Sequence, residues 1–413
     1  DRDPADPESM RVPLPRASAA WREAAGAGGD AGGGVTYVAV SRQLSNFCYP
    51  GADGGGSGAA SPGGKEGFRR AFLARYRSSG GASRLSVAYK PGFAGVLAPE
   101  RLAEVSPKAA AVVEGARRCK GAVFVYSDFL WFGVIPLAVA LEEVGFLPHS
   151  ESGRAQPLLD RGPGGAGKPA RAPDRASARR YFVISDDPTI SSGSVSQAYA
   201  AVRAGLVDVV LGSRSAGEGI SLPGIREVYV MEPWFNVQRT EQAVGRALRR
   251  CSHGHLPPER RNVTVFVLCA AAPRGASPST DETVSRTAAA KNKTIRVLRE
   301  EMRAISVDCG AYEEDSAAGA AARGGPVEDS RGRRVPPDAL RRARGAAARA
   351  RGGGEAPACL LLAGPGLPTR APDSSSMHPY FRRHAIDMTA LEAIAVLEAA
   401  RAPVGYEDLR ERT

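Results

Sequence analysis

The sequence predicts a doubly wound α/β fold, and three observations lead to that prediction. Short apolar runs recur along the middle of the chain, each bounded by glycine or polar residues, as expected of strands covered on both faces. Segments long enough for helices lie between them, so strand and helix alternate. Glycine and proline, 48 and 31 of 413 residues, cluster largely outside this alternation and mark low-complexity segments. We therefore expect a parallel sheet with helices on both faces.

The first elements of this block are a helix, a strand and a second helix. Apolar residues recur at helical spacing over 107–119, with Ser106 as a candidate N-cap and proline in the first turn. Residues 121–127 then form a near-continuous apolar run, typical of a buried strand. Residues 129–144 are predicted to form a buried helix, and their apolar run is too short to span a bilayer. No membrane association is expected.

The alternation continues as far as residue 268, after a Gly/Pro/Arg-rich interruption at 150–178. Further strands are predicted at 180–185, 207–211, 227–231 and 263–268, with helices at 195–204 and 236–250 and a long helix at 281–308. The predicted domains are a disordered segment at 1–34, a segment at 35–100 with a short strand and a Gly-rich insertion, the α/β domain at 101–272, the long helix within 280–311, and a mostly disordered tail at 312–413 with room for a short helix at 388–401. Order is expected to resume near Leu102 after the insertion.

Charge and cysteine usage exclude little. The net charge of +11 fits either a solvated surface with arginine-rich tails or a polyanion partner. The six cysteines lack CxxC spacing, so neither a zinc module nor a disulfide framework is indicated. An intracellular protein is expected, without a choice between nucleus and cytoplasm.

The strongest chemical signal is the segment Gln242–Arg250, QAVGRALRR. In a helix, Arg246 and Arg249 would share one face, with Gln242 and Gly245 just before them. Guanidinium groups suit phosphate oxygens, and two on one face can hold a transferring γ-phosphoryl group. The alternative interpretation is a basic helix face in solvent.

A second signal is the loop at 212–222, GSRSAGEGISL, between two predicted strands. Glycines and small hydroxyl residues at the carboxyl end of a parallel strand favour a loop whose backbone amides approach phosphates.

These segments carry a resemblance to a known family. The pattern Q-x-x-G-R-x-x-R has the form of motif VI of superfamily 2 helicases, while 212–222 resembles motif V and 123–129 resembles motif IV. With MEPWFN at 231–236, the chain resembles the helicases of large nucleocytoplasmic DNA viruses. That group includes the poxvirus early transcription factor small subunit and nucleoside triphosphatase I, and it is related to Snf2-type translocases. The likeness covers about 35–311, broken by two insertions.

The resemblance implies a RecA-like C-terminal lobe and ATP-driven movement on nucleic acid, with DNA favoured over RNA. It assigns Arg246 and Arg249 as arginine fingers. Gln242, Gly245, Gly219 and Glu218 would line the ATP cleft, and Ser127, Ser213 and Ser215 would face the nucleic-acid backbone. ATP and Mg²⁺ would be shared with an N-terminal RecA-like lobe in cis or in trans, and the segment before residue 100 would be the remainder of the inter-lobe region. Nucleus and viral factory are then equally compatible locations.

The chain also departs from the family. No phosphate-binding loop with Lys and Ser/Thr, and no Asp-Glu pair, precedes the motif IV segment. Residues 162–169 have G-x-x-x-x-G-K spacing, but Pro169 replaces the hydroxyl residue and no strand leads into them. The chain begins at Asp1 rather than Met, so we expect a fragment that does not hydrolyse ATP alone.

Two alternatives for the whole chain stay open: a truncated or degenerate lobe that only binds nucleic acid or protein, and a plain α/β metabolic domain, which the pairing of motifs V and VI disfavours. The alternate spacing of Cys251, His253 and His255 does not match a usual zinc motif, so a loop or capping role is expected and no metal site is predicted. Trp131 and Trp234 have apolar neighbours, which favours core packing over base stacking.

Overall fold

The computed structural model describes residues 11–13, 41–50, 64–79, 82–150, 156–161, 178–214, 220–249, 252–272, 277–304 and 327–335. The chain divides into one unit of residues 1–301 and 312–355 and a second of residues 302–311 and 356–413. Of the second unit, only residues 302–304 are among those described. The strand predicted at 35–40 and the helix predicted at 388–401 lie outside the described residues.

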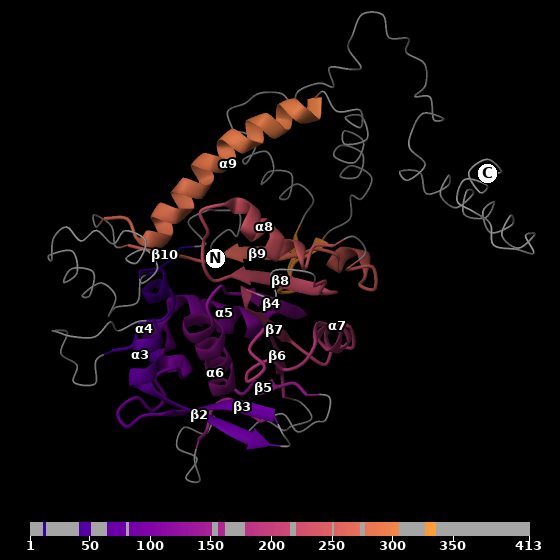
Figure 1. Ribbon diagram of the computed structural model, residues 1–413. Coiled ribbons are helices and arrows are strands. Elements are labelled where there is room, and N and C mark those ends of the chain that lie inside the picture. The colour runs from indigo at the N-terminus through magenta and orange to yellow at the C-terminus, as the bar shows by residue number, and fades with distance from the viewer. Residues whose placement is uncertain are drawn as a thin grey trace, which may run out of the picture. The chain divides into compact units, whose positions relative to one another are not determined.

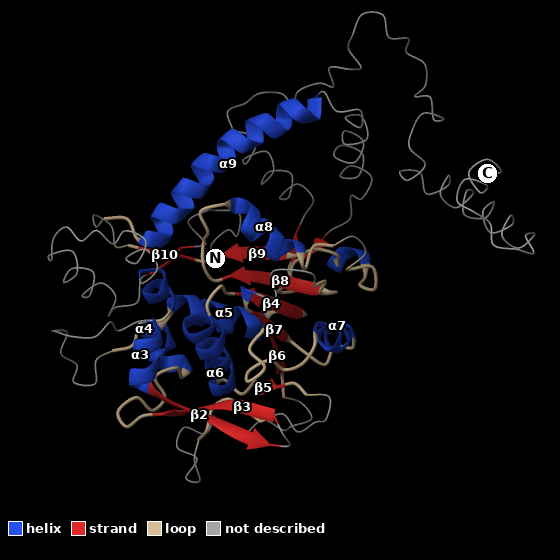
Figure 2. Cartoon of the chain, in the orientation of Figure 1, coloured by secondary structure: helices blue, strands red, loops and turns tan. Residues whose placement is uncertain are grey.

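A six-stranded sheet forms the centre of the first unit, with strand order β5-β6-β7-β4-β8-β9. Every neighbouring pair is parallel (Figure 2). The strands are β4 (Ala122–Tyr126), β5 (Leu147–Pro148), β6 (Arg180–Ile184), β7 (Val209–Gly212), β8 (Ile225–Val230) and β9 (Thr264–Val267). The prediction of a doubly wound parallel sheet is confirmed, and only the two-residue β5 was not anticipated.

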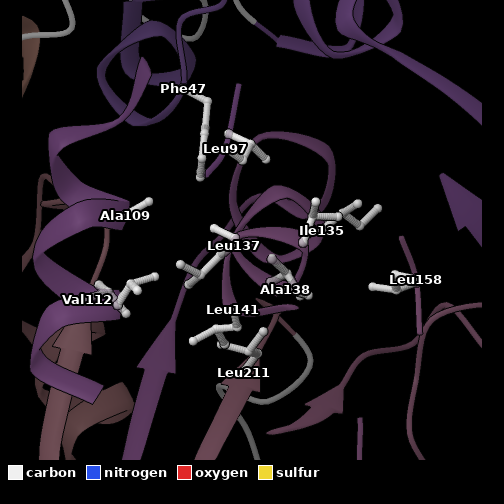
Figure 3. Packing of buried hydrophobic residues seen from close by; sticks show 14 of the residues in the cluster. Phe47, Leu97, Ala109, Val112, Ile135, Leu137, Ala138, Leu141, Leu158 and Leu211 are labelled. Atoms are coloured by element: carbon white, nitrogen blue, oxygen red, sulfur yellow. The ribbon is translucent and has the colours of Figure 1, made fainter. Parts of the chain in front are cut away.

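Helices cover both faces of the sheet. The first face packs against α4 (Pro99–Val105), α5 (Pro107–Arg118) and α6 (Ile135–Glu143), and the second against α7 (Val195–Arg203) and α8 (Val237–Gly245). Alternation along β4 shows why: Val123 and Val125 belong to the first core, whereas Phe124 and Tyr126 belong to the second. Figure 3 shows Val112 of α5 and residues of α6 meeting in the first core.

Helix α5 begins as the sequence predicts. The Ser106 hydroxyl accepts a hydrogen bond from the backbone N–H of Ala109 at 3.0 Å, and Pro107 occupies the first turn. Such a cap satisfies a donor that the helix leaves free and stabilises by about 1 kcal/mol. The long apolar face of α5 then packs on the sheet.

The helix predicted from residue 129 starts differently. A π-helical turn covers Leu130–Val134, Phe132 lies outside helical geometry at φ −132° and ψ 31°, and α6 begins only at Ile135. The turn passes very close to the end of β4, because a Cβ atom on Gly133 would lie 2.0 Å from the Ser127 hydroxyl. The helix starts irregularly because its first turn lies so close to the end of β4.

Helix α8 is shorter than predicted, ending at Gly245 instead of continuing to residue 250. Residues 246–248 form a turn in which Ala247 and Leu248 both donate to the Val244 carbonyl, at 3.0 and 3.2 Å. The Arg246 carbonyl instead accepts the N–H of Leu222 at 2.9 Å, which ties the turn to the preceding loop. Ala247 is fully buried in the second core, so its packing favours this turn over a continued helix.

Order begins well before Leu102, contrary to the sequence-based expectation. Helix α3 (Gly64–Ala71) leads into an antiparallel hairpin of β2 (Phe72–Ser79) and β3 (Ala82–Tyr89). Tyr49, Phe68 and Phe72 form an aromatic cluster with ring centroids 4.6 to 6.4 Å apart, and they are part of the first core. Figure 1 shows these elements beside α4 and α6.

Two segments predicted to be disordered contribute strands. β1 (Arg11–Pro13) pairs in parallel with β10 (Cys269–Ala271), and β11 (Val327–Glu328) pairs with β12 (Arg334–Val335) as a hairpin. The hairpin packs at the start of β8, where the Ser330 hydroxyl donates to the buried Glu227 carboxylate at 2.5 Å. Arg226 donates to the Glu328 carbonyl at 2.7 Å. Side-chain partners on β8 thus order a segment of low-complexity sequence.

The long helix α9 covers Thr280–Ala304, close to its predicted range. It starts with a reciprocal cap: Ser279 accepts from the N–H of Glu282 at 3.0 Å, and the Glu282 carboxylate accepts from the N–H of Ser279 at 2.8 Å. Val284 and Ala288 are buried, whereas Leu298 is 61% exposed. Within the described residues no helix has the length and apolar character needed to cross a membrane.

Candidate functional site

The candidate site lies at the carboxyl ends of three neighbouring strands, β7, β4 and β8. β4 lies between β7 and β8 in the sheet, and the chain leaves β4 toward β5 on one side but leaves β8 toward β9 on the other. The residues that follow these strands, Asp128, Arg214 and Glu232, are therefore carried to one edge. Ligands of open α/β sheets bind outside this edge, at the point where the strand order reverses.

The Glu232 carboxylate is the buried centre of a hydrogen-bond network at this edge. It accepts from the Ser127 hydroxyl at 2.6 Å, from the N–H of Asp128 at 3.0 Å, and from the side-chain amide of Asn46. Burial raises the pKa of Glu232 above its usual value, and Lys108 opposes that shift. The Ser127 side chain, expected to face nucleic acid, is 1% exposed and points to this carboxylate instead.

A buried lysine connects the network to two other helices. The Lys108 ammonium of α5 donates to the side-chain amide oxygen of Asn46 at 3.0 Å and to the backbone carbonyl of Met231 at 2.7 Å. It also forms an ion pair of 2.6 Å with Asp281 in the first turn of α9, and neither side chain is exposed. Residues 41–50, α5, the end of β8 and α9 are thereby joined at one point.

Trp234 lies against two arginines. The guanidinium carbon of Arg42 is 4.4 Å from the indole centroid, and that of Arg239, in the first turn of α8, is 4.2 Å away. Asp128 holds both cations, at 2.7 Å from Arg239 and 3.7 Å from Arg42. The Tyr126 hydroxyl donates to the same carboxylate at 2.9 Å. The half-buried indole thus contacts protein cations and belongs to neither hydrophobic core, unlike the core packing expected for it.

A cavity of about 280 Å³ opens beside this cluster. Among the described residues, its walls hold two arginines and no carboxylate, so its lining is suited to anionic groups. The lining residues are Tyr126, Arg214, Trp234, Asn236, Gln238, Arg239 and Gln242.

Only some of the predicted site residues line this cavity. Gln242 lines the cavity, but Arg246 and Arg249 do not. Arg246 is half-buried in the turn after α8, with Gly245 just before it, and Arg249 is exposed. Ser213 is buried at the end of β7, where its N–H donates to the Ile184 carbonyl at 3.0 Å. Ser215, Glu218 and Gly219 lie outside the described residues.

Sequence reasoning missed several residues that shape this edge. Arg214 and Glu232 follow strands just as Ser213 and Ser127 do, so the rule that singled out the serines could have found them. Arg239 lies within a predicted helix and outside any motif, and the roles of Arg42 and Asn46 depend on contacts with residues 191 and 186 positions away.

His253, which follows the segment Gln242–Arg250, has a structural role. A His253 ring nitrogen lies 2.6 Å from the Ile225 carbonyl, and the other lies 2.8 Å from the Ser252 hydroxyl. Burial lowers the pKa of His253, which favours the neutral ring. Cys251 lies outside the described residues, and within those that are described no group of three His, Cys, Asp or Glu side chains is placed to hold a metal ion.

Comparisons with known proteins relate part of this chain to helicases. The family described as "Helicase conserved C-terminal domain" matches residues 187–251. The "Putative ATP-dependent RNA helicase R563" of Acanthamoeba polyphaga mimivirus is 30% identical, over 42% of this chain and 27% of that protein. The "Termination factor NPH-I homolog" of African swine fever virus, isolate Warthog/Namibia/Wart80/1980, is 26% identical over 40% of this chain and 26% of that protein.

Among solved structures, the C-terminal part of the Fun30 ATPase domain is similar at 16% identity and a TM-score of 0.27, over 44% of this chain and 45% of that one. The chain spans about a quarter of the length of the two viral relatives. The six-stranded parallel sheet is consistent with a RecA-like α/β fold, and the family match with the viral relatives supports a superfamily 2 helicase C-terminal domain that resembles those of large DNA virus helicases.

Proposed function

We propose that this chain is the C-terminal half of an ATP-dependent superfamily 2 translocase that acts on DNA or RNA. The observation that carries the proposal is the cavity at the carboxyl edge, where Arg214, Arg239 and Gln242 converge and the described lining residues include no carboxylate. Phosphate groups are the ligands that such a lining fits best.

In this proposal, the residues around this edge have different roles. Asp128 orients Arg239 through a 2.7 Å ion pair, so that guanidinium is held in place before any ligand arrives. Gln242, Gly245, Glu218 and Gly219 would belong to the ATP side, and Ser213 and Ser215 to the nucleic-acid side. Arg246 and Arg249 would be the fingers that neutralise charge on the transferring phosphoryl group.

The nucleotide would need a second lobe. The chain contains no G-x-x-x-x-G-K-[ST] sequence, so the loop that cradles the phosphates and the carboxylates that hold Mg²⁺ would come from an N-terminal RecA-like lobe. The names of the viral relatives include both an RNA helicase and a termination factor, so both nucleic acids belong in the test.

The test is ATP hydrolysis by the full-length gene product, assayed alone and with single-stranded DNA, double-stranded DNA and single-stranded RNA. Hydrolysis stimulated by one of these is expected, with a loss of at least a hundredfold in the double variant Arg246→Ala/Arg249→Ala, since a finger can contribute roughly 10³-fold or more. The matched control is Arg117→Ala/Arg118→Ala, an exposed arginine pair on α5 whose ion-pair partner is Glu114 on the same helix.

Equal activity in the finger variant and the control would contradict the assignment of the fingers. Nucleic-acid binding with no hydrolysis under any condition would instead favour a lobe that serves only as a binding module.

A further inference from the structure

Strand β2 forms an open edge on the side of the domain that carries the hairpin. It belongs to a two-stranded sheet and, within the described part of the chain, pairs only with β3, in antiparallel register (Figure 1). All side chains from Leu73 to Ser78 are exposed. Two of them are large and apolar, because Leu73 is 41% and Tyr76 is 57% exposed. An edge of this kind is a template for a further strand.

The direction of the backbone groups follows from the hydrogen bonds on either side of the hairpin. The N–H groups of Leu85 and Val87 point away from β2, to the carbonyls of Thr189 at 2.9 Å and Leu158 at 2.7 Å. Bonded and non-bonded pairs alternate along an antiparallel ladder, and Val87 and Leu85 lie opposite Ala74 and Tyr76. The N–H and C=O groups of Ala74 and Tyr76 therefore point outward from the open edge.

Charge distinguishes the two faces of this strand. Leu73, Arg75 and Arg77 lie on one face, with Arg84 of β3 opposite Arg77. Arg77 pairs with Asp160, whereas Arg75 has no ion-pair partner within the described residues. Tyr76 lies on the other face. The edge thus combines unpaired peptide groups, an available cation and exposed apolar surface.

We propose that β2 is a docking edge for an extended acidic segment of a partner protein, which adds to the hairpin as a third strand. Peptide groups of the segment would pair with Ala74 and Tyr76. Its side chains beside Arg75 would be acidic, and those beside Tyr76 apolar, so the sequence recognised alternates between the two types. This surface is separate from the carboxyl edge of the main sheet, and the proposal goes beyond the translocase function.

Two other occupants fit the edge less well. A second copy of β2 would bring arginines against arginines, and like charges on adjacent strands destabilise pairing. Nucleic acid would satisfy Arg75, but it offers no ladder of peptide groups to the outward N–H and C=O groups.

The experiment titrates a fluorescein-labelled peptide of alternating valine and glutamate, seven residues long, against the full chain by fluorescence anisotropy. Ala74→Pro removes one outward N–H without touching the β2–β3 ladder, and proline is tolerated on an edge strand at such a position. Ala74→Val keeps the N–H and is the matched control. Arg75→Glu reverses the charge. A valine–lysine peptide and a 20-nucleotide oligo(dT) are the comparison probes, and urea unfolding verifies that each variant folds.

The expected result is saturable binding of the acidic peptide that Ala74→Pro weakens at least tenfold and Ala74→Val changes less than twofold. Arg75→Glu should weaken it by a similar factor and favour the lysine peptide. Three outcomes would overturn the proposal: no binding of the acidic peptide by the wild type, equal binding by the proline variant, or displacement of the peptide by the oligonucleotide.

Discussion

Glu142, near the end of α6, is a buried carboxyl group with three donors around it. It accepts from the N–H groups of Leu158 and Leu159, both at 2.8 Å, and from the Tyr181 hydroxyl at 2.6 Å. These bonds favour the ionised form, as does the charge of Arg161, but the loss of solvation is larger and raises the pKa of Glu142 to about 7. The protonated carboxyl is therefore populated in the folded state at pH values where the unfolded chain has lost that proton.

This shift predicts a pH dependence of stability. Because the folded pKa is raised, the contribution of Glu142 is fully present below pH 4.5 and is lost as the pH rises to about 7. The difference in unfolding free energy between wild type and Glu142→Gln, which mimics the neutral acid, should move by roughly 3 kcal/mol in favour of the variant between low and high pH. Urea unfolding of both proteins at pH 4 and pH 8 measures it. A constant difference would show that the carboxyl is ionised throughout.

At the scale of the elements, the π-helical turn between β4 and α6 has little room for a larger side chain. Its Gly133 faces the Ser127 hydroxyl so closely that no Cβ atom fits without movement, and that hydroxyl is bonded to Glu232. The turn and the buried network at the carboxyl edge are therefore packed as one piece.

Gly133→Ala should lower the free energy of unfolding by about 1–3 kcal/mol, the usual range for overpacking. Gly245→Ala is the matched control, since a Cβ atom there meets nothing within 4 Å at the end of α8. It should be neutral or stabilise by up to about 1 kcal/mol through reduced freedom of the unfolded chain. Urea unfolding of the two variants measures the difference. Equal midpoints would show that the turn shifts to accommodate the added methyl group at no cost in stability.

The same elements show which features a sequence reveals. Strands such as β4 and β8 are buried on both faces, so their apolar runs identify them without any knowledge of their neighbours. Strand β2, with the sequence FLARYRSS, is exposed along most of its length and shows no such run. The hairpin at 327–335 is ordered by contacts with β8, which no local pattern reveals.

The candidate site divides in the same way. The place of Gln242 at the cavity was predictable, because it lies in a short motif whose chemistry depends on local spacing. The network of Asn46, Lys108 and Glu232 was not, because its members come from three segments far apart in sequence and only the fold brings them together. The end of α8 before Arg249 likewise depends on a bond from Leu222 to the following turn.

At the scale of the whole molecule, the hairpin of β11 and β12 belongs to the first unit and packs at the start of β8. It supplies the hydroxyl of Ser330 to Glu227, which is fully buried, and a carbonyl to Arg226. Removing these partners would leave two charged groups of β8 without hydrogen bonds that they have in the folded chain.

A chain ending after residue 355 should therefore be as stable as the full chain, because it keeps the hairpin. A chain ending after residue 326 should lose roughly 3 kcal/mol, the value of two hydrogen bonds to charged groups. Urea unfolding of both shortened chains gives the comparison. If the shorter chain unfolds at the same urea concentration as the longer one, the hairpin does not stabilise the domain.

The buried ion pair between Lys108 and Asp281 has a consequence for how relatives of this chain can diverge. Either charge left alone in that position would be buried without its partner, which costs several kcal/mol, whereas replacing both by apolar residues can be neutral. Single substitutions at either position should therefore be rare steps between viable sequences. We expect relatives to keep both residues or to exchange both, so that the long helix and α5 evolve as a matched pair.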